Sequence, residues 1–145
     1  MIVRIGPEDF DTGAELARLE ALGGGAVASF TGIVRGGPDF ESMTLDHYPA
    51  MTQAALEALA NEANARWQLA GVTIIHRVGE LRKGERIVLV ACASDHRAAA
   101  LDACAFLIDN LKTKAPFWKK ERDVGGIEKW VDARESDDEA ASRWG

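Results

Sequence analysis

Short runs rich in β-branched residues recur along the chain and are bounded by Gly, Pro or Asp, which is the pattern of β-strands. The run within residues 85–93 is apolar at nearly every position, so we expect a central strand covered on both faces. Gly32 interrupts another run and predicts a bulge or a close backbone approach. The predicted strands span residues 1–5, 26–35, 43–48, 71–79, 85–93, 117–122 and 127–134.

Longer segments with apolar residues at helical spacing predict helices at 11–22, 51–67 and 95–115. In the second of these, apolar residues recur at every fourth position from Met51 to Trp67 and are expected to form one buried stripe. In the third, Asp95 is the expected N-cap. Pro116 ends that helix, because proline disfavours helical geometry in the residue before it.

The order of the predicted elements is strand, helix, two strands, helix, two strands, helix, two strands. This order mixes hairpin-like and crossover connections, and it predicts an α+β fold with helices packed on a mixed sheet. The length fits a single domain over residues 1–145. We expect residues 36–42 to form a loop and residues 136–145 to form an acidic tail that is only partly ordered.

The composition limits the classes of protein to which the chain can belong. It is 47% hydrophobic and 28% charged, as in soluble globular proteins, and no run approaches the roughly 20 apolar residues of a membrane helix. The first ten residues, MIVRIGPEDF, lack the pattern of a signal peptide, so we expect a cytoplasmic protein. The net charge of -6 argues against general nucleic-acid binding, for which basic domains are usual.

The two cysteines, Cys92 and Cys104, lie in apolar runs. They form no CxxC motif, and no histidine stands near either of them at the spacing of a zinc site. We therefore expect two buried, reduced thiols and no bound metal. His47 and His76 lie in predicted strands, and we interpret both as structural residues.

Cations gather in the segment LKTKAPFWKKER, residues 111–122, although the whole chain is acidic. The segment holds Lys112, Lys114, Lys119, Lys120 and Arg122 with a single acid. This local excess of positive charge predicts a pocket for an anion; the alternative is a solvated helix end followed by a charged loop. Lysine suits a pocket that binds an anion, since it is a compact cation. When desolvated, it can also act as a base or nucleophile.

On a helical wheel, Arg97 and Lys112 share a sector with apolar residues of the third predicted helix. These apolar residues are Leu101, Cys104, Ala105 and Ile108. A charge at each end of a buried stripe must reach solvent by snorkelling or face a polar site. Along the helix the two charges are about 22 Å apart, at ~1.5 Å per residue. If both bind one ligand, either the ligand is long or the site combines two subunits. His96 lies beside Arg97, where the first helical turn also suits a phosphate.

Nearly the whole chain resembles the large, catalytic subunit of molybdopterin synthase, and the resemblance is most specific in six segments that occur in order. They are GAVASFTGIVR (25–35), LDHYPAMT (45–52), VTIIHRVGEL (72–81), SDHRAAAL (94–101), LKTKAPFWKKE (111–121) and WVDARESD (130–137). The resemblance implies an α/β hammerhead fold with additional strands. It also implies a sulfurtransferase that inserts two sulfurs into cyclic pyranopterin monophosphate and so forms the dithiolene of molybdopterin.

The same resemblance implies the partners of the chain. Sulfur is expected to arrive as a thiocarboxylate on the C-terminal Gly-Gly of a small ubiquitin-like subunit. Two copies of this chain are expected to form a homodimer with one small subunit at each end, a heterotetramer. No cofactor is expected.

When the functional positions of the family are matched to this sequence, the resemblance implies that Lys112 and Lys119 are catalytic. The substrate-binding positions that it implies are Phe30, Ile33, Val34, Arg35, His96, Arg97, Lys120 and Glu121. Among these, His96 and Arg97 are expected to reach the anionic end of the substrate from the neighbouring subunit. The chain departs from the family at Ile33, where many relatives carry Lys, and at the short loop 36–42.

Two other interpretations stay open at the level of the sequence. One is a sulfurtransferase in which Cys92 or Cys104 carries the sulfur as a persulfide. The other is a non-catalytic module that binds an anion or the acidic tail of a partner through residues 112–122. Lys114 and Arg122 have no catalytic role in our interpretation and fit either a catalytic or a docking protein.

Overall fold

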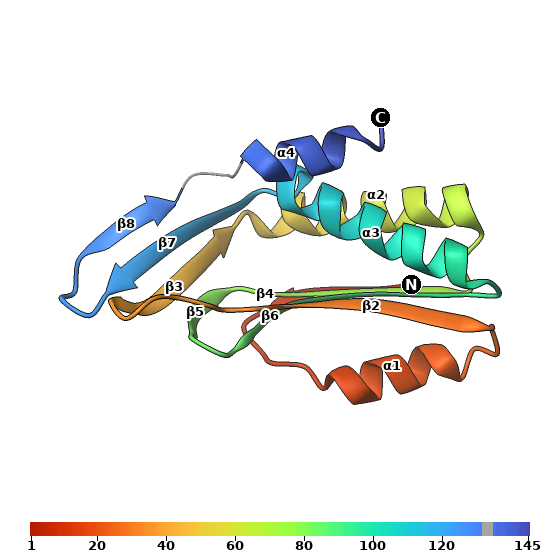
Figure 1. The fold of residues 1–145 in the computed structure, drawn as a ribbon, viewed down its shortest axis with the longest axis horizontal. Helices are drawn as coiled ribbons and strands as arrows, with labels where there is room; N and C mark the ends of the chain where they lie inside the picture. Colours follow the sequence, from red (N-terminus) through yellow and green to blue (C-terminus); the bar gives the residue numbers. More distant parts are fainter. Residues whose placement is uncertain (132–134) are drawn as a thin grey trace.

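The computed structural model describes residues 1–131 and 135–145. In chain order its elements are β1 (Ile2–Gly6), α1 (Thr12–Glu20), β2 (Ala26–Ile33), β3 (Phe40–His47), α2 (Pro49–Trp67), β4 (Gly71–Arg77), β5 (Gly79–Arg82), β6 (Arg86–Ser94), α3 (Arg97–Lys114), β7 (Phe117–Asp123), β8 (Glu128–Val131) and α4 (Glu135–Ser142). The strands form two four-stranded sheets (Figure 1). The predicted α+β class is confirmed.

The first sheet has the order β1-β4-β6-β2 and is mixed, since β1 and β4 are parallel and the other pairs are antiparallel. α2 and α3 cover one face and α1 covers the other (Figure 1). Along β6, Val88 and Val90 pack with α2 and α3, whereas Leu89 and Ala91 pack with α1. Burial on both faces explains why β6 is apolar throughout, and it confirms the predicted central strand.

The second sheet has the order β5-β3-β7-β8 and is antiparallel throughout. It extends away from the first sheet on the left of Figure 1. Its inner face helps to bury a small core of Val34, Met43, Leu45 and Leu81. Its other face leaves Asp46, Trp118 and Trp130 exposed. The element order predicted one mixed sheet; the structure has two, because β3 pairs with β5 and β7 and not with β2.

The buried face of α3 differs from the predicted stripe. Leu101 is 60% exposed, while Ala100, Ala103 and Leu107 are fully buried against the first sheet. The helix is apolar around most of its circumference, so the wheel alone does not identify the buried side. The predicted N-cap was also wrong: His96 is the N-cap, and it makes no side-chain capping hydrogen bond.

The predicted stripe of α2 is only partly correct. Leu59 and Ala63 are buried as expected, but Met51 is 62% exposed and Thr52 and Leu56 take its place. A step of four residues turns by about 40°, because 3.6 residues make one turn, so the ends of such a stripe face different directions. Neither α2 nor any other helix among the described residues is long and apolar enough to cross a membrane.

Two strands extend into segments that were expected to be connections. β3 begins at Phe40, inside the loop predicted for 36–42. β5 covers Gly79–Arg82, and its last three residues lie where a connection between two strands was expected. β5 has one inward apolar residue, Leu81, between the exposed Glu80 and Arg82, so its sequence carries little apolar pattern. Its strand conformation depends on pairing with β3.

The C-terminal segment forms a helix, although only partial order was expected there. α4 lies beside α3 (Figure 1), and the Trp144 ring after it packs against Trp67 and Phe106, with centroids 5.8 and 5.6 Å away. The Trp144 indole N–H also donates to Asp109 at 2.8 Å. β7 and β8 pair as predicted over residues 119–131. Ile127 precedes β8, and residues 132–134 of the predicted strand lie outside the described residues.

Candidate active site

A cavity of about 530 Å³ lies where the end of β2, the last turn of α3 and the inner face of the second sheet meet. Its wall is apolar on the side of β3, β6 and α3, where it includes Leu45, Ile87 and Leu111. Its ionisable lining residues are Arg35, His76, Lys112, Lys119, Glu121 and Asp137. Apolar walls with convergent polar groups are typical of a binding site for a small molecule.

Lys112 and Lys119 reach this cavity from either side of Pro116. α3 ends at Lys114, and the backbone of the next residue is extended, as the following proline requires. β7 then runs antiparallel to β3 and places Lys119 opposite Leu45. The structure therefore brings the two lysines predicted to be catalytic into one cavity.

The strand alternation of β7 separates its two neighbouring lysines. Lys119 and Glu121 line the cavity. Lys120 lies on the other face of the sheet, where its Nζ is 2.8 Å from a carboxylate oxygen of Glu128 and 5.4 Å from the ring centroid of Trp130. Lys120, predicted as a substrate-binding residue, is therefore not part of this cavity in the chain.

The end of β2 contributes Ile33, Val34 and Arg35 to the cavity, as predicted. The register of β2 shifts between Gly32 and Ile33, which confirms the predicted irregularity. A Cβ on Gly32 would lie 2.8 Å from Cγ1 of Val88, so only glycine allows this close approach. The Val34 N–H then donates to the carbonyl oxygen of Glu85 at 2.9 Å, which fixes the backbone beside Arg35.

His76 lines the same cavity, although the sequence led us to interpret it only as structural. Its Nδ1 is 2.8 Å from the carbonyl oxygen of Arg77; a carbonyl only accepts, so Nδ1 carries the proton. Burial, with the positive charge of Lys112 as a smaller cause, lowers the pKa of His76 to about 4. A neutral ring with a protonated Nδ1 leaves Nε2 as a hydrogen-bond acceptor.

Three other predicted residues do not reach this cavity in the chain. His96 and Arg97 lie at the opposite end of α3 from Lys112. Phe30 lies on β2 and is 37% exposed. Besides the residues at the cavity, the predicted set thus includes Phe30 within β2, His96 and Arg97 at the far end of α3, and Lys120 on the outer face of the second sheet.

The chain was compared with families and proteins of known identity. The profile of a family described as "MoaE protein" matches residues 5–114. The molybdopterin synthase catalytic subunit of Ralstonia nicotianae is 50% identical over 148 residues, which cover 99% of this chain and 84% of that protein. The molybdopterin synthase catalytic subunit of Escherichia coli is 49% identical over 144 residues, which cover 97% of this chain and 95% of that protein.

The chain belongs to the MoaE family. Solved structures agree: the molybdopterin biosynthesis MoaE protein from Burkholderia ambifaria is 49% identical, covers 99% of this chain and 97% of its own, and superposes with a TM-score of 0.84. The molybdopterin synthase of Staphylococcus aureus is 30% identical, covers 88% of this chain and 95% of its own, and has a TM-score of 0.78. The family predicted from the six sequence segments is confirmed, and with it the role of a catalytic subunit in molybdenum cofactor biosynthesis.

The two thiols of this MoaE-family chain lie in the core, apart from the cavity. Cys92 and Cys104 are free and buried between the first sheet and α3. Burial raises the pKa of Cys92 to about 12 and that of Cys104 to about 11, so both remain protonated thiols near neutral pH. Within the described residues no group of three or more His, Cys, Asp or Glu side chains is arranged to hold a metal ion.

Several cavity residues of this MoaE-family chain were not predicted from the sequence. Asp137 comes from α4, in a segment that was expected to be only partly ordered. His76 lies within an apolar run that forms a strand. A polar residue at such a position was the one feature of the sequence that could have marked it as a site residue. Phe117, the first residue of β7, also lines the cavity.

Proposed function

We propose that this chain inserts two sulfurs from a thiocarboxylated small subunit into cyclic pyranopterin monophosphate and so forms the dithiolene of molybdopterin. The proposal is based on one observation: Lys112 of α3 and Lys119 of β7 line the same cavity. Both the phosphate and the thiocarboxylate are anions, and this cavity also holds Arg35. The relatives named as molybdopterin synthase catalytic subunits support the same reaction.

We assign the roles of the residues from their positions. Arg35 is a bidentate donor for the substrate phosphate. Lys112 stabilises the oxyanion, or transfers protons, where the donor's C-terminus meets the substrate. Lys119, at the start of β7, orients the thiocarboxylate. Apolar residues that include Leu45 and Leu111 border these charged groups, and apolar surroundings strengthen electrostatic contacts.

The chemistry of the thiocarboxylate determines which bonds break and form during sulfur transfer. Each transfer breaks the bond between sulfur and the C-terminal glycyl carbon, and a water oxygen replaces the sulfur there. The small subunit leaves as an ordinary carboxylate. At the acceptor carbon of the substrate a carbon–sulfur bond forms and a carbon–oxygen bond breaks, and the displaced oxygen leaves as water or stays on the phosphate. No cysteine of this chain takes part, in keeping with the buried thiols of Cys92 and Cys104. Reduced thiols also fit a cytoplasmic location, which we propose for this protein.

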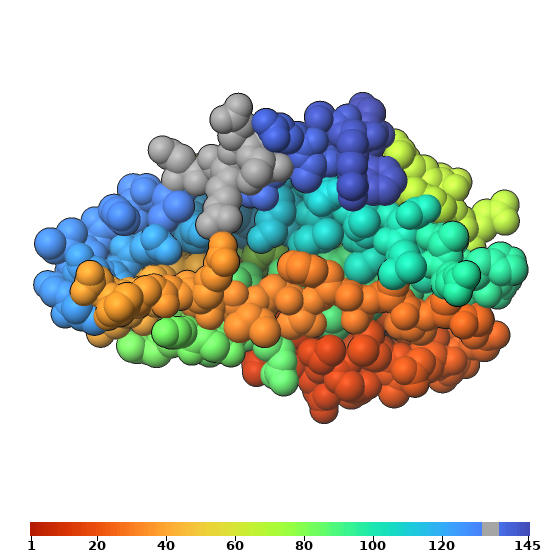
Figure 2. All heavy atoms as spheres, in the orientation of Figure 1, coloured from red at the N-terminus to blue at the C-terminus, as the bar shows by residue number. Residues whose placement is uncertain are grey.

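The partners that we propose are the small subunit and a second copy of this chain. A Helicobacter pylori structure described as a complex of subunits 1 and 2 of molybdopterin-converting factor has the same fold, with 24% identity and a TM-score of 0.77. In the present chain β2 is an edge strand of the first sheet. Figure 2 shows β2, in orange, open on the near face between α3 and α1. Ile33 on this strand and Leu101 on α3 are exposed apolar side chains.

We infer that β2 pairs antiparallel with the β2 of a second copy, because β2 is an edge strand, and this arrangement would account for the expected contribution of the partner. Within one chain Ala26, at the start of β2, pairs with Ser94, which is two residues before His96. The eight residues of β2 span about 26 Å, so its start is far from Arg35 in the same chain. A two-fold axis near Phe30 would bring the start of one β2 beside the end of the other. The partner's His96 and the partner's Arg97 would then approach Arg35.

The test is mass spectrometry of the pterin after the chain, the thiocarboxylated small subunit and the precursor are mixed. The expected result is a mass gain corresponding to two sulfurs in place of two oxygens, with no gain when the small subunit ends in an ordinary carboxylate. An unchanged pterin, with the small subunit bound, would instead support the non-catalytic docking module.

A further inference from the structure

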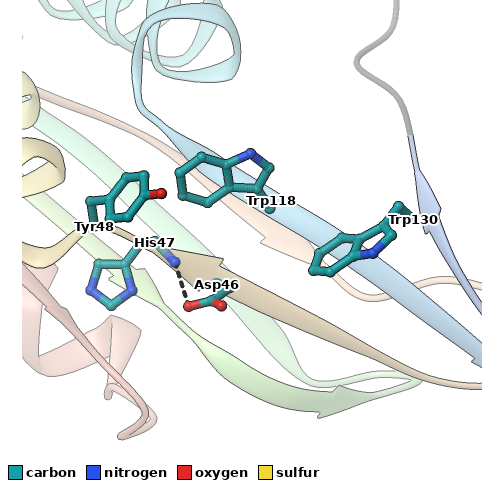
Figure 3. A pocket seen from close by; sticks show the side chains of 5 residues that line it. All are labelled: Asp46, His47, Tyr48, Trp118 and Trp130. Atoms are coloured by element: carbon teal, nitrogen blue, oxygen red, sulfur yellow. Dashed lines mark hydrogen bonds between the residues drawn. The ribbon is translucent and has the colours of Figure 1, made fainter.

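A second cavity, of about 280 Å³, opens on the face of the second sheet opposite the candidate active site (Figure 3). We call it the outer groove, and it is lined by Asp46, His47, Tyr48, Trp118 and Trp130. The three large aromatic side chains, Tyr48, Trp118 and Trp130, are 58%, 41% and 62% exposed. Exposed aromatic residues that gather on one face mark an interaction surface, and Trp and Tyr dominate the energetic centres of interfaces.

The outer groove combines aromatic rings with a carboxylate. Asp46 lies directly opposite Trp118 in the pairing of β3 with β7. The ring of Tyr48 meets that of Trp118 edge to face, with centroids 4.7 Å apart. One oxygen of Asp46 accepts a hydrogen bond from the His47 N–H at 2.8 Å, drawn in Figure 3. Among the described residues no cation forms an ion pair with Asp46, so its second oxygen is available.

On the same face of the sheet, a lysine of this chain already contacts both an indole ring and a carboxylate. Lys120 lies opposite Trp130 in the pairing of β7 with β8. Its Nζ is 5.4 Å from the Trp130 ring centroid and 2.8 Å from a carboxylate oxygen of Glu128. Trp118 with Asp46 repeats the combination of an indole and a carboxylate two residues earlier on β7, but without a cation from the described residues.

We propose that the outer groove binds an arginine side chain of a partner protein, with the guanidinium against the Trp118 ring and hydrogen-bonded to Asp46. Arginine suits this place better than lysine, because its planar group stacks on aromatic faces and is more weakly hydrated. The carboxylate of Asp46 supplies the complementary charge, since Lys120 on the same face is already paired with Glu128. The groove uses the face of β7 that carries no proposed catalytic residue, so this inference does not depend on sulfur transfer.

The test follows the indole N–H signals of the full chain by NMR during titration with a short capped peptide that contains two arginines. The control peptide has citrulline at both positions, which keeps the shape and removes the charge. We expect saturable shifts of the Trp118 and Trp130 signals with the arginine peptide. The signals of Trp67 and Trp144 are expected to stay in place, because these rings pack on each other and on Phe106.

Substitutions test the Asp46 carboxylate and the Trp118 ring separately. Asp46→Asn is expected to weaken binding of the arginine peptide by about twofold to fivefold, the effect of one exposed contact of a cation. Asp102→Asn, at an exposed position of α3, is the matched control and is expected to leave binding unchanged. Trp118→Ala is expected to abolish the shift at Trp130.

Three outcomes would overturn the inference. The first is equal binding of the arginine and citrulline peptides, which would mean that the groove does not select a cation. The second is the absence of any shift at Trp118 and Trp130. The third is a shift of these signals with protein concentration alone, which would assign the groove to a second copy of this chain.

Discussion

The imidazole ring of His76 lies flat against the phenyl ring of Phe117, with centroids 3.9 Å apart and planes 16° apart. His76 belongs to β4 of the first sheet and Phe117 begins β7 of the second, so this contact joins the two sheets at the wall of the candidate active site. Phe117 precedes Lys119 by two residues on the same face of β7. The stacked pair therefore helps to set the position of Lys119.

Replacement of His76 by Gln is expected to remove part of the loss of stability in acid. The pKa of His76 is lowered by burial to about 4 from an ordinary 6.5, so between these values the unfolded chain binds a proton that the folded chain does not. Stability that is present above pH 6.5 is therefore lost as the pH falls toward 4, by up to roughly 3 kcal/mol. Urea unfolding at pH 7 and near pH 4.5 measures this difference.

The matched control for that measurement is His96→Gln, since His96 is exposed at the start of α3. This variant is expected to lose as much stability in acid as the unmodified chain. The same acid loss in His76→Gln as in the unmodified chain would show that His76 is not the group responsible.

Lys112→Ala and Lys119→Ala are each expected to reduce dithiolene formation by about 100-fold or more, the range for loss of an acid–base or oxyanion-stabilising group. Lys114→Ala is the control, because Lys114 lies in the same last turn of α3 but does not line the cavity. Turnover is measured by mass spectrometry of the pterin, with folding checked by circular dichroism. Near-normal turnover in a folded Lys112→Ala variant would contradict its assigned role.

A mixture of two inactive variants tests whether Arg97 acts across the proposed dimer. After unfolding and refolding together, Arg97→Ala and Lys112→Ala chains should recover about a quarter of the normal activity, because half of the dimers are mixed and one site in each is intact. If Arg97 served the site of its own chain, every site would lack one residue and no activity would return. Each variant refolded alone provides the baseline.

Replacement of both cysteines by alanine is expected to leave sulfur transfer in place. The thiols of Cys92 and Cys104 are buried, and their raised pKa values of about 12 and 11 disfavour the thiolate that sulfur chemistry requires. The folded protein should also react slowly with a thiol reagent and rapidly once unfolded. Loss of transfer in a stable Cys92→Ala/Cys104→Ala protein would instead favour a persulfide on this chain.

Trp144→Ala is expected to destabilise the protein by about 1–3 kcal/mol in chemical unfolding, through the loss of aromatic packing and a hydrogen bond. Trp144 contacts Trp67 and Phe106, and its indole N–H donates to Asp109. Arg143→Ala is the control: the Arg143 side chain is 59% exposed, and its removal takes away one ion pair with Asp109 and one contact with the Trp144 ring but keeps the ring itself, so stability should change by less than about 1 kcal/mol. An equal effect of both variants would mean that the ring packing contributes little.

Much of the local structure follows from short-range pattern. The β-branched run of β6 predicts a buried strand, Pro116 predicts the end of α3, and Gly32 predicts the irregularity of β2. The order of six segments identifies the family, and the positions of Lys112 and Lys119 within them select the two lysines. These features depend on residues close together in the chain, which is why the sequence is sufficient for them.

The assignment of faces required the tertiary structure. The sequence places Lys119 and Lys120 side by side, and only the pairing of β7 with β3 shows that Lys119 lines the cavity and Lys120 lies outside it. The wheel of α3 did not reveal that Leu101 is exposed, because most of this helix is apolar.

The sequence by itself therefore determined most of the helices and strands, the family and the two candidate catalytic lysines. The tertiary structure decided that there are two sheets, that His76 belongs to the cavity, and that Asp46 and Trp118 share a groove on the other side. The physical reason is that a backbone conformation is favoured by neighbouring residues, whereas burial of a given face depends on elements distant in the chain.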